Sequence, residues 1–260
     1  MQPLDRISVL VTRPAGQAES LARAIEAAGG TAIRAPMIVI AGLDDGAAGS
    51  AIAKRIDQFD IAIFVSRNAA EFCLDLVPSA QRNLARMAVF AVGLGTAACL
   101  QSLGVAHALT PSSEFSSEGL LRLDGLSEQK VKGKRIAIFR GIGGREYLAK
   151  TLERRHALVT YCDCYARRKT LIVLSATLKK NSIKVPDIGL ATSIEVLDNL
   201  VEKIEAEGID QLFDMQMLVV GSRVGQEVAS LGFTQRPLVV ENPSDESILK
   251  QLMNWANNDP

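Results

Sequence analysis

The sequence predicts an α/β fold in which helices cover parallel sheets and one structural unit occurs twice. Short runs of β-branched residues alternate with segments of helical period along the 260 residues, which is typical of parallel sheets covered by helices. The chain also repeats itself, faintly but in order, at a shift of about half its length. The shift is far longer than that of a short solenoid repeat, so the two observations predict two similar α/β units made by duplication.

Each βα step begins with a strand-like segment, the first of which is at residues 7–11. An apolar stripe of helical period at residues 196–204 predicts a helix packed on a sheet. The Gly-rich stretch 41–50 and the Lys/Asn-rich stretch 179–181 are predicted to be loops. Further strands are expected at residues 61–65, 87–92, 135–139, 188–191 and 217–220.

The repeat is carried by four pairs of matching segments. They are residues 9–16 with 137–144, 63–68 with 190–194, 90–93 with 218–221, and 116–121 with 244–249. A domain boundary near residue 128 fits this order, and so does an interleaved arrangement in which the middle of the chain forms one domain and both ends form the other. The residues alone leave both arrangements open.

Composition narrows the class of protein. The chain has 29 basic and 29 acidic residues and no Lys/Arg run, so it lacks the basic footprint of a nucleic-acid binder. No apolar run approaches the roughly 18 residues of a membrane span, and we expect a cytoplasmic protein. The four cysteines have no Cys-x-x-Cys spacing and neither histidine lies beside them, which favours reduced structural thiols and no metal site.

Six polar turns each follow a predicted strand and precede a predicted helix. Ligands of open parallel sheets bind at this edge, where helix N-termini present unpaired N–H groups. A single Ser, Thr or Asn there is more often a helix cap, but six in two similar units indicate a cleft for one ligand with several carboxylates or phosphates. The turns are Arg13-Pro14-Ala15-Gly16, Ser66-Arg67-Asn68-Ala69, Gly93-Leu94-Gly95-Thr96, Arg140-Gly141-Ile142-Gly143-Gly144, Thr192-Ser193 and Gly221-Ser222.

Other chemistries fit the sequence less well. Gly93-Leu94-Gly95 resembles part of a dinucleotide fingerprint, but no acidic residue stands near position 113. The chain has no phosphate-binding P-loop and no nucleophile elbow with a downstream His. A general acid would then come from another side chain or from backbone dipoles. Tyr161 and Tyr165 stand out, because we expect them just after the strand that follows the Arg140 segment; for Tyr161 we favour a packing role.

These motifs, taken in order over nearly the whole chain, resemble the uroporphyrinogen-III synthase family, which closes a linear tetrapyrrole during tetrapyrrole biosynthesis. No single motif is diagnostic, and the order and spacing carry the resemblance. The motifs are Val11-Thr12-Arg13-Pro14 with Gln17-Ala18, Ser66-Arg67-Asn68-Ala69, residues 91–97, Ser116-Ser117-Glu118-Gly119-Leu120, and Gly133-Lys134-Arg135 leading to Arg140-Gly141 and Gly144-Arg145.

The resemblance implies two similar three-layer parallel-sheet domains, duplicated and interleaved, joined by a two-stranded antiparallel linker. One domain comprises residues 1–37 and 169–260, the other residues 38–168, and the hinge strands lie near 35–40 and 161–170. It further implies a monomer without cofactor that converts hydroxymethylbilane to uroporphyrinogen III, losing water and inverting the last pyrrole ring.

The resemblance also implies roles for residues. The tyrosine after the inter-domain strand matches Tyr165, which would assist departure of the hydroxyl. The substrate carboxylates would lie against the polar turns. The substrate-binding residues are then Arg13, Ser66, Asn68, Ala69, Gly93, Gly95, Thr96, Ser116, Ser117, Arg140, Gly141, Gly144, Thr192, Ser193, Gly221 and Ser222.

Two departures from the family pattern bear on residues 192–224. Relatives usually show a Thr-Ser-Pro-Ser-like turn where this chain has Glu195, and a threonine where it has Val224. Two alternative functions remain: a two-domain binding protein or sensor for a small polycarboxylate, which would not need Tyr165, and a nucleotide-dependent oxidoreductase.

Overall fold

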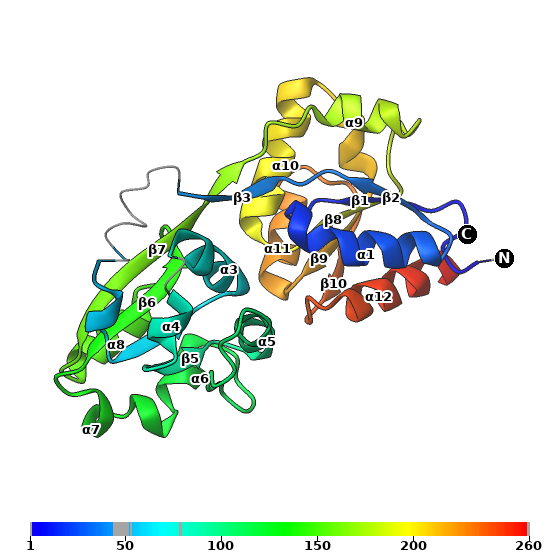
Figure 1. Cartoon of the computed structure of the whole chain (residues 1–260). Coiled ribbons are helices and arrows are strands. Elements are labelled where there is room, and N and C mark those ends of the chain that lie inside the picture. The colour runs from blue at the N-terminus through cyan, green and yellow to red at the C-terminus, as the bar shows by residue number, and fades with distance from the viewer. Residues whose placement is uncertain (1, 44–51, 53, 78–79, 259–260) are drawn as a thin grey trace. The chain divides into compact units, whose positions relative to one another are not determined.

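The computed structural model describes residues 2–43, 52, 54–77 and 80–258. They divide into two compact units, unit 1 (Met1–Val39 with Arg168–Pro260) and unit 2 (Ile40–Arg167), each built around its own sheet (Figure 1). That each unit acts as a domain with the predicted limits and hinge strands stays a prediction.

Unit 1 contains a five-stranded sheet in the order β10-β9-β8-β1-β2, in which all neighbours are parallel. The strands form where the sequence has short, largely apolar runs, as expected for a sheet buried on both faces. Its strands are β1 (Ser8–Val11), β2 (Thr31–Arg34), β8 (Ile188–Ala191), β9 (Gln216–Val220) and β10 (Leu238–Val240). Its helices are α1 (Ala15–Ala27), α9 (Leu174–Lys180), α10 (Ile194–Glu207), η3 (Asp210–Asp214), α11 (Ser222–Ser230) and α12 (Asp245–Asn258).

Helices cover both faces of this sheet. On one face, α1 and α12 pack together against Val9, Val11, Leu190 and Leu218. On the other, α10 contacts β8, α9 and α11, and α11 contacts β9 (Figure 1). Unit 1 is therefore a three-layer structure.

Unit 2 contains the second five-stranded sheet, in the order β3-β7-β6-β4-β5. β7, β6, β4 and β5 are parallel neighbours. Its strands are β3 (Ile38–Gly42), β4 (Ile61–Phe64), β5 (Ala88–Ala91), β6 (Arg135–Gly141) and β7 (Leu158–Lys169). The first residues of β3 and the last residues of β7 belong to unit 1. Its helices are η1 (Ile56–Gln58), α3 (Arg67–Leu76), α4 (Ala80–Leu84), α5 (Leu94–Ser102), α6 (Ser117–Leu121), η2 (Asp124–Leu126), α7 (Glu128–Val131) and α8 (Tyr147–Arg154).

Two separate cores cover the faces of this sheet. The first joins α3, α4 and α5 to the face that carries Phe64 and Phe139, whose rings stack with centroids 4.6 Å apart. The second joins α6, η2, α7 and α8 to the face that carries Ile63 and Ile138. Unit 2 therefore has the same three layers as unit 1.

The repeat in the sequence is a repeat of sheet positions. The first residues of β6, β7 and β8 lie at one constant distance along the sequence from the first residues of β1, β2 and β4, respectively. For β5 and β9 this distance is one residue longer. The order β2-β1-β8-β9 in unit 1 thus matches β7-β6-β4-β5 in unit 2. Each half of the chain gives its first strands to one sheet and its later strands to the other, so the predicted duplicated, interleaved α/β fold is confirmed.

Three local predictions need comment. The loop predicted at residues 179–181 is wrong in part, because Lys179 and Lys180 form the last turn of α9, where basic side chains favourably face the helix C-terminus. Tyr161 and Tyr165 lie inside β7, not after it, because this strand runs on for 12 residues between β6 and β3. The loop predicted at 41–50 begins within β3, and residues 44–50 lie outside the described part of the chain.

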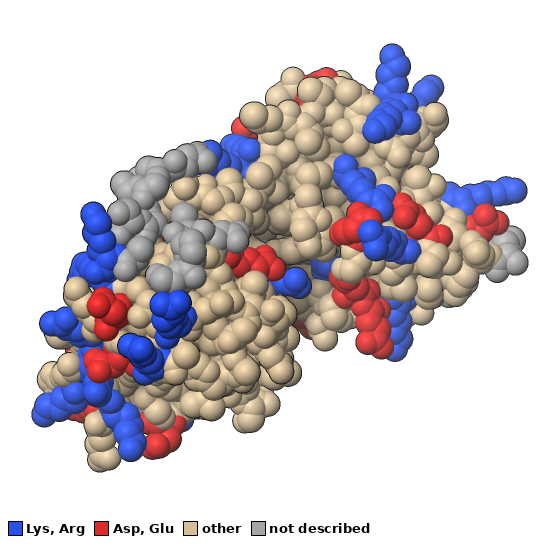
Figure 2. Space-filling model, in the orientation of Figure 1, with Lys and Arg blue, Asp and Glu red and all other residues tan. Residues whose placement is uncertain are grey.

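Charged side chains of both signs are interspersed on the visible surface of each unit (Figure 2). None of the described helices is long and apolar enough to cross a membrane.

Candidate functional site

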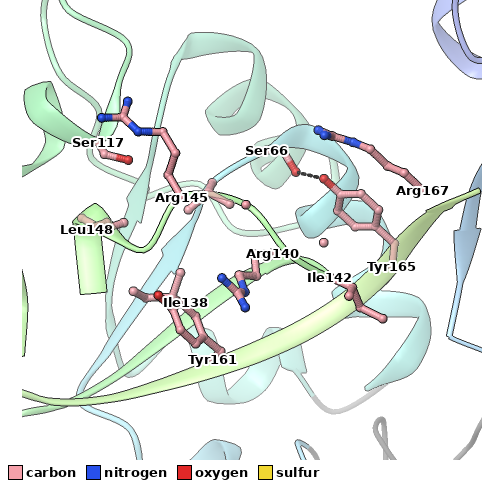
Figure 3. A pocket seen from close by; sticks show the side chains of 14 residues that line it. Ser66, Ser117, Ile138, Arg140, Ile142, Arg145, Leu148, Tyr161, Tyr165 and Arg167 are labelled. Atoms are coloured by element: carbon pink, nitrogen blue, oxygen red, sulfur yellow. Dashed lines mark hydrogen bonds between the residues drawn. The ribbon is translucent and has the colours of Figure 1, made fainter. Parts of the chain in front are cut away.

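A pocket of about 240 Å³ lies at the carboxyl edge of the unit 2 sheet (Figure 3). The ends of β4 and β6, the loop from β6 to α8, and β7 supply most of its wall. Six sequence-predicted site residues line it: Ser66, Ser117, Arg140, Gly141, Gly144 and Tyr165. The remaining lining residues are Val65, Ile138, Ile142, Gly143, Arg145, Leu148, Tyr161 and Arg167.

A β-bulge positions Tyr165. β6 and β7 pair in register up to Arg140 opposite Asp163, but Gly141 then pairs with Tyr165, so β7 carries one extra residue. A bulge of this kind turns a side chain toward the other face of the sheet. Tyr165 accordingly packs in the core that covers the α3 face, its ring 5.8 Å from that of Phe72, whereas Tyr161 packs on the α8 face.

Gly141 makes room for the Tyr165 ring. A Cβ atom on Gly141 would lie 2.6 Å from Cε2 and 2.7 Å from Cζ of Tyr165, closer than non-bonded carbons approach. The backbone N–H of Ile142 donates to the Tyr165 carbonyl at 2.8 Å. The phenol, only 3% exposed, is therefore fixed in place by its neighbours.

The Tyr165 hydroxyl meets Ser66, which precedes α3 as its N-cap. The two side-chain oxygens are 3.1 Å apart (Figure 3). The Ser66 hydroxyl oxygen also accepts the backbone N–H of Ala69 at 3.1 Å, as an N-cap does. Its own proton is free to be donated to the tyrosine oxygen, which leaves the phenolic proton available to a ligand.

Arg140 lies in the same pocket and is held from two sides. Its Nε donates to Asp163 Oδ1 at 3.0 Å, and its guanidinium carbon is 3.5 Å from the centroid of the Tyr161 ring, within cation–π range. Burial raises the pKa of Tyr161, and the Arg140 charge offsets this only in part. Among the described residues, no hydrogen-bond partner is found for the buried Tyr161 hydroxyl.

The start of α6 forms another wall. Ser116 caps this helix by accepting the N–H of Gly119 at 3.1 Å, and Ser117 faces the pocket. Arg145 donates to Glu118 at 2.6 Å. The N–H of Glu118 itself and Arg145 hold the pKa of the Glu118 carboxyl below its usual range.

Several predicted site residues of unit 2 lie at the same sheet edge but do not line this pocket. They stand at the starts of helices whose N-caps are Ser66, Gly93 and Ser116. These residues are Asn68, Ala69, Gly93, Gly95, Thr96 and Ser116.

The unit 1 candidates occupy the corresponding edge of the other sheet. Ser193 caps α10 by accepting the N–H of Val196, and Gly221, with φ of 83°, precedes α11. Thr192 and Ser222 adjoin these two caps. A helix thus starts at or after each of the polar turns. The exception in spacing is α8, which does not begin until three residues after Gly144, because Gly143 and Gly144 take positive φ angles and form a loop.

Arg13, the unit 1 counterpart of Arg140, is engaged within the protein. Its Nη1 donates to Asp245 Oδ1 at 2.6 Å and its Nη2 to the Pro243 carbonyl at 2.5 Å. The residue is 7% exposed. Arg13 therefore braces the contact between α1 and α12.

Sequence reasoning did not select Tyr161, Arg145 and Ile142 as site residues. The signal for the last two was present, since both belong to the turn between β6 and α8 that was already recognised. Tyr161 was assigned to packing, which the structure confirms for its ring, but the same ring also supports Arg140.

The four cysteines are free and buried, and burial raises the pKa of Cys162 to about 12. This agrees with the predicted structural thiols. Within the described residues, no group of three or more His, Cys, Asp or Glu side chains is arranged to hold a metal ion.

Comparison with known proteins decides the family. Residues 19–250 match the family model for uroporphyrinogen-III synthase HemD. The chain belongs to the uroporphyrinogen-III synthase family. It is similar to uroporphyrinogen-III synthase of Escherichia coli K12, with 29% identity over 254 residues, 95% of this chain and 100% of that one. The Salmonella typhimurium enzyme is 30% identical over 250 residues, again 95% and 100% of the two chains.

Solved structures of the family share the fold. A mutant uroporphyrinogen III synthase from Thermus thermophilus superposes with a TM-score of 0.60 at 15% identity, covering 98% of this chain and 100% of that one. The Helicobacter pylori 26695 enzyme gives 0.59 at 15% identity, with 97% and 99% covered. The predicted function, uroporphyrinogen-III synthase activity in tetrapyrrole biosynthesis, is confirmed by the family and the relatives.

The two departures from the family pattern have simple structural settings. Glu195 is exposed in the first turn of α10. Val224 belongs to α11 and is 6% exposed. Its side chain is therefore part of the buried interior of unit 1.

Proposed function

We propose that the chain closes linear hydroxymethylbilane to uroporphyrinogen III, and that Tyr165 assists the first step as a general acid. The observation that carries this assignment is the buried Tyr165 hydroxyl at the pocket, 3.1 Å from Ser66. In the proposed arrangement the Ser66 hydroxyl, whose oxygen also accepts the Ala69 N–H, donates its proton to the phenolic oxygen. The arrangement directs the phenolic proton toward a ligand and stabilises the phenolate that remains.

The proposed step is balanced as follows. The C–O bond of the hydroxymethyl group on the first ring breaks, the phenolic proton joins the departing oxygen, and water leaves. The electron pair of the pyrrole nitrogen replaces the broken bond, which gives the protonated azafulvene, a cation whose charge the phenolate balances. The last ring then attacks through its substituted α-carbon to give a spirocyclic pyrrolenine, which fragments and recloses with that ring inverted. The proton that the ring system finally loses restores the phenol.

Positioning supplies the larger share of the catalysis. The bilane closes without enzyme to the isomer whose last ring is not inverted, so the protein has to hold the chain in the less accessible geometry. The polar turns at the carboxyl edges of both sheets support this role, because helix N-termini attract carboxylates. We also propose that the enzyme works as a monomer without cofactor, its units hinged near residues 35–40 and 161–170.

The test is Tyr165→Phe. We expect kcat to fall about 100-fold, at the lower end of what general acid catalysis contributes, with little change in the Kd for uroporphyrin III, the oxidised product. Tyr147→Phe is the matched control, since Tyr147 is 40% exposed and does not line the pocket. Full turnover by Tyr165→Phe would remove the acid role, whereas a binding protein without catalytic function would show no turnover in either form.

A further inference from the structure

The duplication supplies an internal comparison for the Arg140 pocket. Arg13 and Arg140 occupy equivalent positions in the repeat, at the ends of the equivalent strands β1 and β6. Helices α12 and α6 are equivalent as well, and their first residues are Asp245 and Ser117. Arg13 is hydrogen-bonded to the first residue of α12, whereas Arg140 lines the same pocket as the first residue of α6.

The two arginines differ in what they bind. In unit 1, the Asp245 carboxylate and the Pro243 carbonyl take both terminal nitrogens of Arg13. In unit 2, Asp163 takes only the Nε of Arg140, and no described residue forms a hydrogen bond with its Nη1 or Nη2. A buried guanidinium normally satisfies these donors, because desolvated unpaired N–H groups are costly.

The side chain of Arg140 is nonetheless only 16% exposed, and it is prevented from rotating away. Asp163 and the Tyr161 ring, 3.5 Å from the guanidinium carbon, hold it in one orientation. A guanidinium group fixed in one orientation can bind a carboxylate through its two terminal nitrogens with little loss of side-chain entropy.

The space beside Arg140 in unit 2 is a pocket, whereas beside Arg13 in unit 1 the Asp245 carboxylate occupies the equivalent place. Serine stands at position 117 where unit 1 has the Asp245 carboxylate, and Ser117 lines the pocket with Arg140. Gly143 and Gly144 line it too, and a Cβ on either would meet no atom within 4 Å. In Figure 3, Arg140 lies in the midst of the pocket-lining side chains, beside Tyr161.

We propose that Arg140 binds one side-chain carboxylate of the tetrapyrrole, in the place that the Asp245 carboxylate occupies beside Arg13 in unit 1. This inference rests on the proposed function, since it takes the ligand to be a tetrapyrrole polycarboxylate. It separates the two arginines that sequence reasoning had grouped: Arg140 binds substrate, and Arg13 braces the fold.

Two substitutions test the proposal from opposite directions. Arg140→Gln removes the guanidinium that would bind the carboxylate. We expect the KM for hydroxymethylbilane and the Kd for uroporphyrin III to rise about 10- to 100-fold, which is the effect of losing one charge-assisted hydrogen-bonded pair. Ser117→Asp places a carboxylate in the pocket, at the position equivalent to Asp245 of unit 1, where it repels the carboxylates of the ligand. It should raise KM and Kd at least as much while the melting temperature is maintained or rises. Arg154→Gln is the matched control, because Arg154 is exposed on α8 and its hydrogen bonds with described residues lie within its own helix.

Measuring both turnover and uroporphyrin binding distinguishes failure of the Arg140 proposal from failure of the proposed function. KM and Kd within twofold of the wild-type values in folded Arg140→Gln would overturn the proposal, even if the wild-type protein makes the type III isomer. If Arg140→Gln does not fold, Ser117→Asp decides by the same criterion, since no hydrogen bond of the Ser117 side chain to a described residue is lost. If the wild-type protein forms no type III isomer, the proposed function fails, and the titrations still test the carboxylate site.

Discussion

Gly141→Ala is the sharpest test of how the fold positions Tyr165. The new Cβ would lie 2.6 Å and 2.7 Å from two ring carbons, and ordinary contact begins near 3.4 Å, so the ring has to retreat by about 1 Å. Gly141 does not have a positive φ, so alanine strains no backbone there. The ring is packed against Phe72, and moving it costs about 1–3 kcal/mol of stability.

We expect kcat to fall about 100-fold, the usual effect of a 1 Å misplacement of a reacting group, because the 3.1 Å contact with Ser66 is broken. The assay is turnover of hydroxymethylbilane. If Gly141 acts through the tyrosine, Gly141→Ala combined with Tyr165→Phe loses little more than Tyr165→Phe alone. Unchanged kcat, or fully additive losses, would show that Gly141 does not act by positioning Tyr165.

Two further predictions concern stability. Asp245→Ala leaves the buried Arg13 charge without its carboxylate and should lower the free energy of unfolding by about 2 kcal/mol, measured by urea titration; a change below the error of the titration would contradict the bracing role. Glu207 accepts the N–H groups of Leu174 and Ser175 at 2.8 and 2.7 Å; burial raises its pKa, but these bonds outweigh burial and the net pKa is lowered. The stability that the ionised Glu207 carboxylate contributes is thus present above the pKa of the unfolded state and is lost as pH falls through the lower pKa of the folded state. Glu207→Gln should therefore lower the free energy of unfolding at pH 7 and lower it much less near pH 3. A loss of stability that does not depend on pH would be evidence against this role.

The elements of the fold could be predicted because strands and helices leave local signals. The apolar runs at Ser8–Val11 and Ile188–Ala191 lie buried on both faces of a parallel sheet, which gives them a continuous apolar pattern. The repeat along the chain predicted the duplication. The residues alone did not distinguish a boundary near position 128 from an interleaved fold, because strand pairing between distant segments leaves no local pattern.

The site could be predicted in outline only. The polar turns were recognised because parallel strands place their carboxyl ends at one edge. Strict alternation along β7 would put Tyr161 and Tyr165 on one face of the sheet, and the bulge at Gly141 separates them. The different partners of Arg13 and Arg140 were equally hidden, because Asp245 and Asp163 are distant in the sequence from the arginines that they contact.

The proposed reaction is closure of the bilane with inversion of the last ring. The direct measurement is the isomer composition of the porphyrin formed when the protein receives freshly generated hydroxymethylbilane, compared with a sample without protein. We expect predominantly type III product, formed faster than in the spontaneous reaction. Type I product alone, at the spontaneous rate, would contradict it.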